Sequence, residues 1–413
     1  MTFWMIKKIT TIFVGVAILS SLIWAGVFYW QNLRGIGPVI KNPPQDIVKL
    51  LPSEEPLPKN TTGIPLKLPD GFSISIFAKN LPGARVLRFD DDGNLWVSRT
   101  SEGIITRLDI KDGKVVNQAD VFKNLRKPHG LVFDPEFKSV LYFAEENKIS
   151  QVSIQSAGKP EKIADLPYGG GHFTRTLGFG PDGRLYVSIG SSCNICHESD
   201  DRRAKIFSMN RDGSDFKEFS RGLRNTVFFT WEPVSGSMWG TDMGRDLLGD
   251  DTPPDEINVI QQGKNYGWPV CYGKNVHDDN FDHNSYIRNP CMDPFEVAST
   301  IDIPAHSAPL GLAFIPKDPP AGGWPESYRY NLMVSYHGSW NRTKPTGYKV
   351  VRIKLDASGN YLGTEDFITG WLTNDGALGR PVDILVQPGG SMFISDDKAG
   401  VIYKVRYTAP AKQ

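Results

Sequence analysis

The chain has 413 residues, of which 40% are hydrophobic and 22% are charged. Lys and Arg together number 46, as do Asp and Glu, so the formal net charge is zero. With no net positive charge and no stripe of basic residues, the sequence argues against nucleic-acid binding. The length allows a sizeable core, and the 41 glycines and 30 prolines indicate a turn-rich fold.

The N-terminus differs from the rest of the chain. Lys7 and Lys8 precede about 22 uncharged residues, 9–30, enough for one helix to span a bilayer. The two lysines predict that the N-terminus lies in the cytoplasm. We therefore expect residues 1–31 to be an inner-membrane anchor and the remainder to lie in the periplasm. The alternative is a cleaved signal sequence, which would leave a secreted protein.

Residues 32–66 are interrupted by prolines, among them Pro43, Pro44 and Pro52. This composition predicts a linker that lifts a globular head off the membrane. We place the head at residues 67–408 and a short tail at 409–413.

One pattern recurs along the head: an apolar residue, a turn and then an alternating strand. It reads FDDDGNLWVS at 89–98 and returns at 133–144 and as FGPDGRLYVS at 179–188. Three weaker copies begin near residues 231, 314 and 386. Strand repeats of about 40–50 residues with such turns are typical of propeller blades. The sequence therefore predicts an all-β, six-bladed β-propeller behind an N-terminal transmembrane helix.

The last repeat is one strand short. It has predicted strands at 382–386, 392–395 and 401–407, whereas the alternating segment 72–78 precedes the first repeat. We expect 72–78 to be the outer strand of the last blade, because this pairing closes the ring and leaves no large open edge.

Wider spacing between the later repeats predicts two insertions, at about 243–310 and 316–332. Long ordered insertions in a compact domain are often functional loops.

The chain has four cysteines, and an even number in an exported protein predicts disulfides. Proximity favours Cys193–Cys196 and Cys271–Cys291. The run CNICH at 193–197 also fits a c-type haem attachment site or a redox-active Cys-x-x-Cys pair. The spacing alone leaves these alternatives open.

His172 is the histidine whose position most strongly indicates a function. It lies in GGGHFTR (169–175), directly before a blade strand, and the three glycines allow a ligand to approach the backbone closely. Other polar residues enter or leave blades at corresponding places, and a ring of Arg, His and Asn at a propeller mouth suits a flat ligand with several carboxylates. These candidates are Arg85, Arg224, Asn225, His337, Trp340, Asn341, Arg342 and Arg380.

An acidic loop follows the fourth repeat. It includes Asp242, Asp246 and the run DDTPPDE at 250–256. Calcium prefers many oxygen ligands, and Gly and Pro leave backbone carbonyls exposed, so this loop is a candidate calcium site.

The motifs together resemble those of the soluble quinoprotein sugar dehydrogenases, which use pyrroloquinoline quinone (PQQ). The resemblance covers residues 67–408 and includes RGLRN at 221–225, PAHSAPLG at 304–311 and HGSWNR at 337–342. The last two, with the 193–196 loop, are similar to the L-sorbosone dehydrogenase branch.

The resemblance implies PQQ- and Ca²⁺-dependent oxidation of an aldose or a sugar aldehyde such as sorbosone. His172 matches the general base that takes the hydroxyl proton while hydride passes to PQQ. Arg224 matches the arginine that polarises the quinone oxygen, and Asn225 matches a neighbouring contact. Arg85, Arg380 and the 337–342 segment would bind the PQQ carboxylates.

The same resemblance implies two calcium ions. One would link PQQ to the backbone carbonyls of Gly244 and Arg245. The second would be structural, with Glu256 and the Tyr266 carbonyl among its ligands. Electrons would leave to a cytochrome or a quinone.

The chain departs from glucose dehydrogenase at three positions. Gly171 and Ser191 stand where that enzyme has carboxylates around the catalytic histidine, and Gly338 stands where it has a PQQ-contacting lysine. A non-catalytic propeller that binds a partner or glycan, and a calcium-dependent lactonase-like hydrolase, are the alternative functions.

Overall fold

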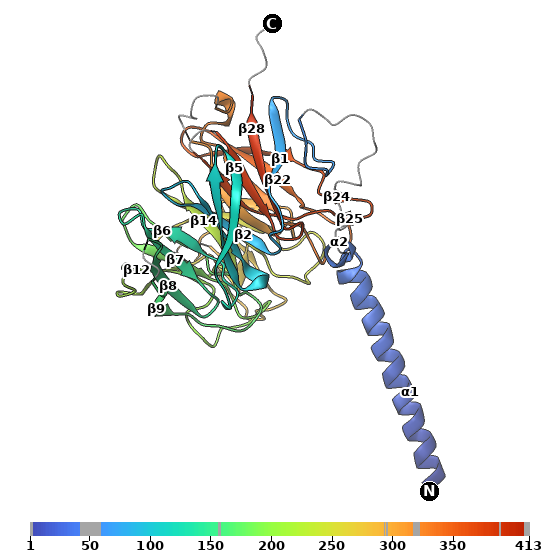
Figure 1. Ribbon diagram of the computed structural model, residues 1–413. Coiled ribbons are helices and arrows are strands. Elements are labelled where there is room, and N and C mark those ends of the chain that lie inside the picture. The colour runs from blue at the N-terminus through green and yellow to red at the C-terminus, as the bar shows by residue number, and fades with distance from the viewer. Residues whose placement is uncertain are drawn as a thin grey trace.

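Six four-stranded antiparallel sheets surround one axis in the computed structural model, as the repeats predict (Figure 1). The structure describes residues 3–41, 59–155, 158–292, 294, 296–316, 323–387 and 390–408. The first blade contains β2 (Ala84–Phe89), β3 (Leu95–Arg99), β4 (Ile104–Lys111) and β5 (Lys114–Phe122). The second contains β6 (Leu131–Phe133), β7 (Val140–Ala144), β8 (Lys148–Ser153) and β9 (Glu161–Asp165). The third contains β10 (Leu177–Phe179), β11 (Leu185–Ile189), β12 (Lys205–Met209) and β13 (Lys217–Arg221).

The later blades carry the insertions. The fourth blade contains β14 (Thr226–Trp231), β15 (Met238–Asp242), β16 (Asp255–Ile260) and β19 (Ile301–Ile303). The fifth contains β20 (Pro309–Phe314), β21 (Leu332–Tyr336), β22 (Lys349–Leu355) and β23 (Tyr361–Ile368). Two small hairpins lie between blade strands: β17 (Cys271–Tyr272) with β18 (Val276–His277), and β24 (Leu372–Thr373) with β25 (Gly376–Ala377). Short 3₁₀ turns occur at Thr100–Glu102 and Glu326–Tyr328.

The turn of the first repeat forms because its aspartate binds both the backbone and an aromatic ring. Asp90 accepts hydrogen bonds from the Asn94 backbone N–H (2.7 Å) and from the Trp96 indole (2.9 Å). Gly93 has a φ of 82°, which a residue with a side chain rarely adopts. This repeat therefore folds locally into the hairpin that begins the first blade.

The sixth blade closes the ring as expected. It contains β26 (Pro381–Val386), β27 (Met392–Asp396), β28 (Val401–Tyr407) and, from the other end of the domain, β1 (Phe72–Ala78). Strand β1 pairs antiparallel with β28. The innermost strands of neighbouring blades contact one another around the axis, including β26 with β2.

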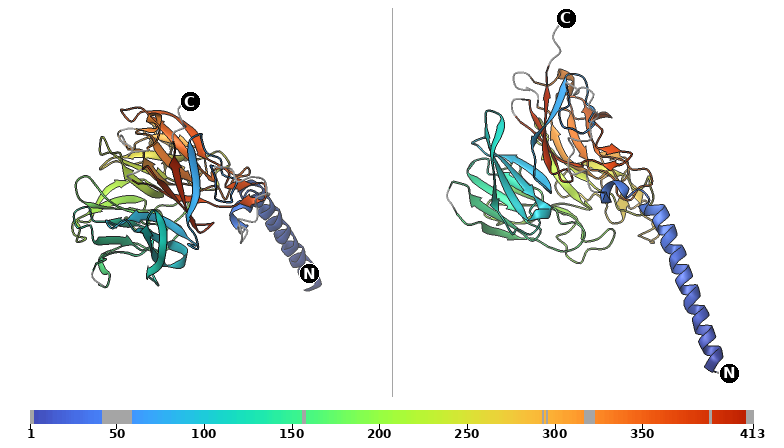
Figure 2. Two further views of the ribbon diagram at one scale, coloured as in Figure 1. Left: turned by 45° about the horizontal axis from the view of Figure 1, so that its top comes forward. Right: turned by 45° about the vertical axis from the view of Figure 1, so that its right-hand side comes forward.

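The N-terminal residues form the helix that the sequence predicts. Helix α1 (Phe3–Phe28) continues as a π-helical turn (Tyr29–Leu33), followed by the short α2 (Gly37–Ile40). Residues Thr10–Leu33 are long and apolar enough to cross a membrane. Figure 2 shows α1 extending away from the propeller.

The predicted linker is not a free spacer where the structure describes it. Val39 packs beside the core of the sixth blade, and the Lys41 ammonium donates to the Asp375 carbonyl (3.1 Å). Lys67 exchanges backbone hydrogen bonds with Thr369. The prolines at 43, 44 and 52 lie outside the described residues.

The pairing of β1 with β28, the seam of the ring, leads to a prediction about stability. Phe72 on β1 is 1% exposed and packs against Trp324 and Phe367, with ring centroids 4.9 Å apart in each pair. Phe72→Ala should lower the free energy of unfolding by about 3–5 kcal/mol, because a large buried side chain is removed. Denaturant unfolding of the full chain in detergent measures this. Leu362→Ala, at a side chain 64% exposed on β23, should change the value by less than about 0.5 kcal/mol. Equal effects would contradict the seam packing.

Candidate functional site

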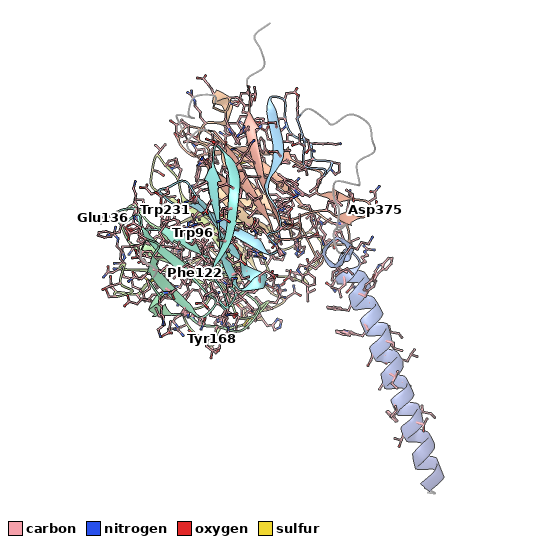
Figure 3. All side chains as sticks on the ribbon, in the orientation of Figure 1. Trp96, Phe122, Glu136, Tyr168, Trp231 and Asp375 are labelled. Carbon is pink, nitrogen blue, oxygen red and sulfur yellow. A yellow bond between two sulfur atoms is a disulfide. The ribbon has the colours of Figure 1, made fainter. Side chains whose placement is uncertain are left out.

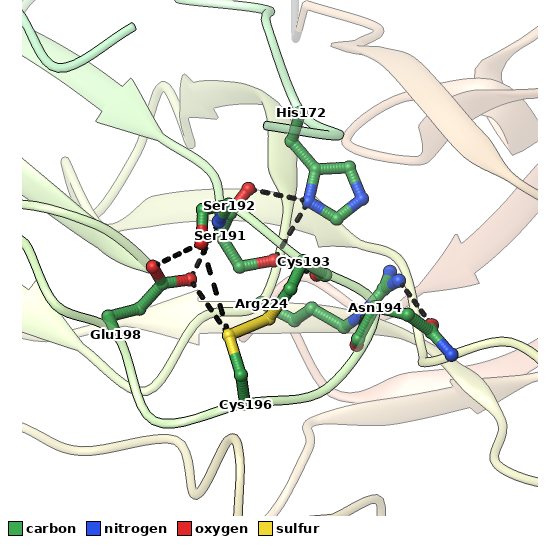
Figure 4. Close-up of a disulfide and its surroundings, with 8 residues drawn as sticks. All are labelled: His172, Ser191, Ser192, Cys193, Asn194, Cys196, Glu198 and Arg224. Atoms are coloured by element: carbon green, nitrogen blue, oxygen red, sulfur yellow. Dashed lines mark hydrogen bonds between the residues drawn. A yellow bond between two sulfur atoms is a disulfide. The ribbon is translucent and has the colours of Figure 1, made fainter. Parts of the chain in front are cut away.

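His172 is held by the strand-end loop of its own blade. Its Nδ1 lies 3.0 Å from the Ser191 carbonyl oxygen and 2.8 Å from the Ser191 hydroxyl (Figure 4). A carbonyl oxygen only accepts, so Nδ1 carries the proton, and the Ser191 hydroxyl in turn donates to the Cys193 carbonyl (2.8 Å). This arrangement leaves the lone pair on Nε2, the nitrogen that has no hydrogen-bond partner among the described residues.

The surroundings of His172 keep its ring neutral. Burial and the nearby Arg224 guanidinium lower the pKa of His172 to about 3. The imidazole is therefore unprotonated across the neutral pH range, and Nε2 is available as a base.

A short disulfide loop follows Ser191. The structure joins Cys193 to Cys196, and it joins Cys271 to Cys291 across the insertion of the fourth blade. Glu198 closes the first loop by accepting hydrogen bonds from the Ser192 amide (2.6 Å) and hydroxyl (2.7 Å). Figure 4 shows His172 and Arg224 beside this disulfide.

Arg224 is buried, and the same disulfide loop orients it. Its guanidinium donates to the Asn194 carbonyl (2.9 Å) and to the Asn194 side-chain oxygen (2.8 Å). It also donates to the Gly244 carbonyl (2.9 Å) and lies 3.6 Å from Asp246. The adjacent Asn225 donates its backbone N–H to Asp242 (2.6 Å), while its side-chain oxygen is buried without a partner.

A second polar group lies where the sixth blade meets its two neighbours. Asp397 pairs with Arg85 (2.7 Å) and with Nε2 of His337 (2.9 Å). Arg380 donates to the His337 carbonyl (3.1 Å) and to the Gly338 carbonyl (2.6 Å).

The loop after β21 connects the two groups. His337 belongs to the Asp397 group, whereas Asn341 donates to Asp246 (3.0 Å), which neighbours Arg224. Trp340 is 36% exposed, and Arg342 pairs with Asp251 (2.6 Å). His172 is joined to Arg224 through Ser191, whose backbone N–H donates to the Arg224 carbonyl (2.8 Å). The backbone of residues 337–341 then connects the Arg224 group to the group of Asp397, Arg85 and Arg380.

Two further guanidinium groups at the mouth donate to backbone carbonyls. Arg175 donates to the His172 carbonyl (3.0 Å) and Arg203 donates to the Gly169 carbonyl (2.7 Å). Neither forms an ion pair within the described ranges. Burial and the neighbouring Arg203 lower the pKa of Arg175 to about 9. An anionic ligand is favoured here, because it would offset this positive charge.

Three carboxylates surround a small cavity under the fourth blade. Its volume is about 20 Å³, room for one water or one ion. The lining includes Asp242, Glu256, Asp278 and Tyr266. Burial raises the pKa of Asp242 well above its ordinary value, and the nearby Glu256 adds to the effect. One oxygen of Asp278 is buried without a hydrogen-bond partner, so these oxygens fit a divalent cation.

The residues expected to hold the PQQ-linked calcium, Gly244 and Arg245, line the same cavity. The Gly244 carbonyl accepts the Arg224 hydrogen bond, and the Arg245 guanidinium pairs with Asp278 (2.9 Å). Both guanidinium groups line the cavity as well, so their charge opposes that of the carboxylates. The calcium site at Gly244 and Arg245 stays a prediction.

Several functional candidates carried no clear signal in the sequence. Asn194 is an ordinary residue inside a Cys-x-x-Cys loop, and Asp397 follows a strand end like many solvated acids. Asp246, part of the acidic loop that the sequence offers as a candidate calcium site, contacts Arg224 and Asn341. Aligning the ends of equivalent strands would have singled out Asp397. It directly follows β27 in the sixth blade, as His337 directly follows β21 in the fifth.

Comparison with known proteins identifies relatives of this chain. The model of the TrAA12-like family matches residues 66–408. A Borreliella burgdorferi protein of uncharacterized function is 33% identical over 365 residues, which cover 83% of this chain and 91% of that protein. Quinoprotein glucose dehydrogenase B of Acinetobacter calcoaceticus is 23% identical, over 81% of this chain and 87% of its own length.

The holo form of the PQQ domain of pyranose dehydrogenase from Coprinopsis cinerea has the same fold. Its TM-score is 0.69 at 20% identity, over 84% of this chain and 99% of that domain. The expected resemblance to PQQ-dependent sugar dehydrogenases is thereby confirmed, whereas the sorbosone branch stays a prediction.

A buried histidine below the mouth predicts a pH effect. His129 is fully buried, with Nδ1 3.4 Å from the Thr176 hydroxyl, and burial and Arg85 lower its pKa well below the ordinary value. The unfolded chain binds a proton at this histidine below about pH 6.5 and the folded chain does not, so stability falls as the pH falls through that value.

His129→Gln should therefore make the loss of unfolding free energy between pH 7 and pH 5 smaller by about 2 kcal/mol. Denaturant unfolding at the two pH values measures the difference. His283→Gln, at an exposed ring, serves as the control and should leave the loss unchanged. If His129→Gln loses as much unfolding free energy between pH 7 and pH 5 as the unsubstituted chain, His129 is not held neutral by burial.

Proposed function

Because this chain belongs to the TrAA12-like family, we propose that it oxidises an aldose or a sugar aldehyde, with PQQ bound at the propeller mouth. The observation that carries the proposal is the hydrogen bond from His172 Nδ1 to the Ser191 carbonyl (3.0 Å). It fixes the tautomer that a base acting through Nε2 requires.

The residues of the mouth fit PQQ, which is flat and carries several carboxylates. Asp397 pairs with Arg85 and its charge also acts on the nearby Arg380, and Arg175 and Arg203 contribute further positive charge. We assign Arg85, Arg380 and the 337–342 segment to the carboxylates of PQQ. When bound, PQQ supplies the two-electron oxidant that accepts the hydride from the sugar.

The protein itself positions the base and keeps additional negative charge away from it. His172 Nε2 accepts the proton of the sugar hydroxyl. The Ser191 carbonyl orients the ring in place of a carboxylate and adds no negative charge. Arg224, fixed by Asn194, stabilises negative charge that develops beside it, with Asn225 as its neighbour.

We propose that calcium supports the site from the acidic cavity. Asp242, Glu256, Asp278 and the Tyr266 carbonyl would hold the ion, and Gly244 and Arg245 line the same cavity. We further propose that α1 anchors the head in the inner membrane with the propeller in the periplasm, where an electron acceptor, a cytochrome or a quinone, reoxidises PQQ.

Titration of the full chain with PQQ in the presence of Ca²⁺ tests the function. We expect bound quinone absorbance that an aldose reduces. His172→Gln should retain PQQ binding but lower turnover by about 10²–10⁴-fold, the usual contribution of a general base. His197→Gln, at an exposed ring in the neighbouring disulfide loop, should leave turnover unchanged. Absence of sugar-reducible absorbance at every calcium concentration would refute the function.

Calcium removal tests the acidic cavity separately. Excess chelator should lower the melting temperature by at least about 2 °C, since a ligand at 100 times its Kd stabilises by about 2.7 kcal/mol. Asp278→Asn should abolish the response to chelator, whereas Asp279→Asn, at an exposed neighbour, should preserve it. A chelator response that survives in Asp278→Asn would place the ion elsewhere.

A further inference from the structure

The segment that joins the membrane helix to the propeller lies against the mouth. Nε of Arg34 donates to the Thr343 hydroxyl (2.6 Å), and the Thr343 backbone N–H donates to Asp250 (2.9 Å). Gly35 packs so closely that a Cβ there would lie 1.5 Å from the Arg342 carbonyl oxygen. Only glycine allows this approach.

A second set of contacts fixes the other end of the segment. The Lys398 ammonium donates to the Val39 carbonyl (3.2 Å), and Lys41 donates to the Asp375 carbonyl (3.1 Å). Lys398 directly follows Asp397, and Arg342 ends the segment that begins at His337. The membrane anchor therefore docks on the two loops that hold the Arg85 and Arg380 guanidiniums.

The direction of α1 relates this docking to the membrane. In Figure 3, Tyr168 lies at the lower edge of the head, on the side toward which α1 extends, and Asp375 lies where α1 meets the head. Glu136 lies at the left edge of the head and Trp231 further in, and both lie higher than Tyr168 in this view, farther from the end toward which α1 extends. Tyr168 belongs to the loop between β9 and β10 that enters a blade at the mouth, whereas Glu136 belongs to the β6–β7 turn at the other end of a blade.

We propose that the propeller mouth faces the bilayer and is held in this orientation by residues 34–41. The groups around the docking site suit a membrane interface. Trp30 and Tyr168 are 64% and 62% exposed, and aromatic side chains concentrate at the level of the lipid headgroups.

This orientation selects an electron acceptor, a consequence that rests on the proposed function. A mouth that faces the bilayer is open to a lipid-soluble quinone. Such a quinone takes two electrons and two protons from reduced PQQ, and it leaves as the quinol while PQQ is restored. A soluble cytochrome would instead need access from the aqueous side.

Photo-crosslinking in vesicles tests the orientation without any need for PQQ. A benzoylphenylalanine replaces either Tyr168 or Phe137, which are similarly exposed at 62% and 56%. The full chain is reconstituted into phosphatidylethanolamine–phosphatidylglycerol vesicles, irradiated and analysed by mass spectrometry. We expect at least about fivefold more lipid adduct from position 168. Equal adduct yields from the two positions, or a larger yield from position 137, would overturn the proposal. Cleavage of α1 from the chain in cells would overturn it as well.

Two glycine variants test whether the docked segment sets the orientation. Gly35→Ala should reduce the lipid adduct at position 168 toward that at 137, because its methyl group collides with the Arg342 carbonyl. Gly37→Ala should keep the full yield, because a Cβ there meets no atom within 4 Å. An unchanged yield in Gly35→Ala would refute the role of the segment. With added quinone, Gly35→Ala should slow quinone reduction but not reduction of a water-soluble dye, and loss of both would count against the proposed function instead.

Discussion

The pairing of β1 with β28 is the constraint on which the rest of the structure depends. It joins the first strand of the propeller to the last and closes six blades into a ring. The polar group of Asp397 straddles this seam, because Arg85 comes from the first blade, His337 from the fifth and Arg380 from the start of the sixth. Arg85 and Asp397 are 312 residues apart in sequence yet 2.7 Å apart in space. The candidate cofactor site therefore exists only while the ring is closed.

One short loop orients both groups to which we assign the chemistry. The Ser191 carbonyl and hydroxyl hold His172, and Asn194 holds Arg224 from three residues further on. The Cys193–Cys196 disulfide closes this loop between the two contacts, so one covalently constrained segment orients both the imidazole and the guanidinium. A carbonyl partner fixes the tautomer of the ring and adds no negative charge. It raises the pKa of His172, but burial and Arg224 lower that pKa by more, so the ring is a weak base that stays unprotonated near neutral pH.

The fold could be predicted from the sequence because it is specified by local patterns. A turn followed by an alternating strand recurs in each repeat and predicts a hairpin, and the strand missing from the last repeat predicted the partner of β28. The candidate site was predictable only as a set of residue types at strand ends. The contacts of Asn194 and Asp397 depend on which loops meet, and these loops come from different blades. The docking of residues 34–41 was missed for a related reason: proline content predicts a spacer, whereas the close approach of Gly35 to Arg342 depends on tertiary packing.

A structure of the chain with PQQ bound is the most direct test of the central claim that this propeller is a quinoprotein. The account predicts the quinone at the mouth, with its carboxylates against Arg85 and Arg380 and with Nε2 of His172 facing the space left for a sugar. A quinone bound elsewhere on the propeller, or a His172 ring turned so that Nε2 meets the Ser191 carbonyl, would contradict it.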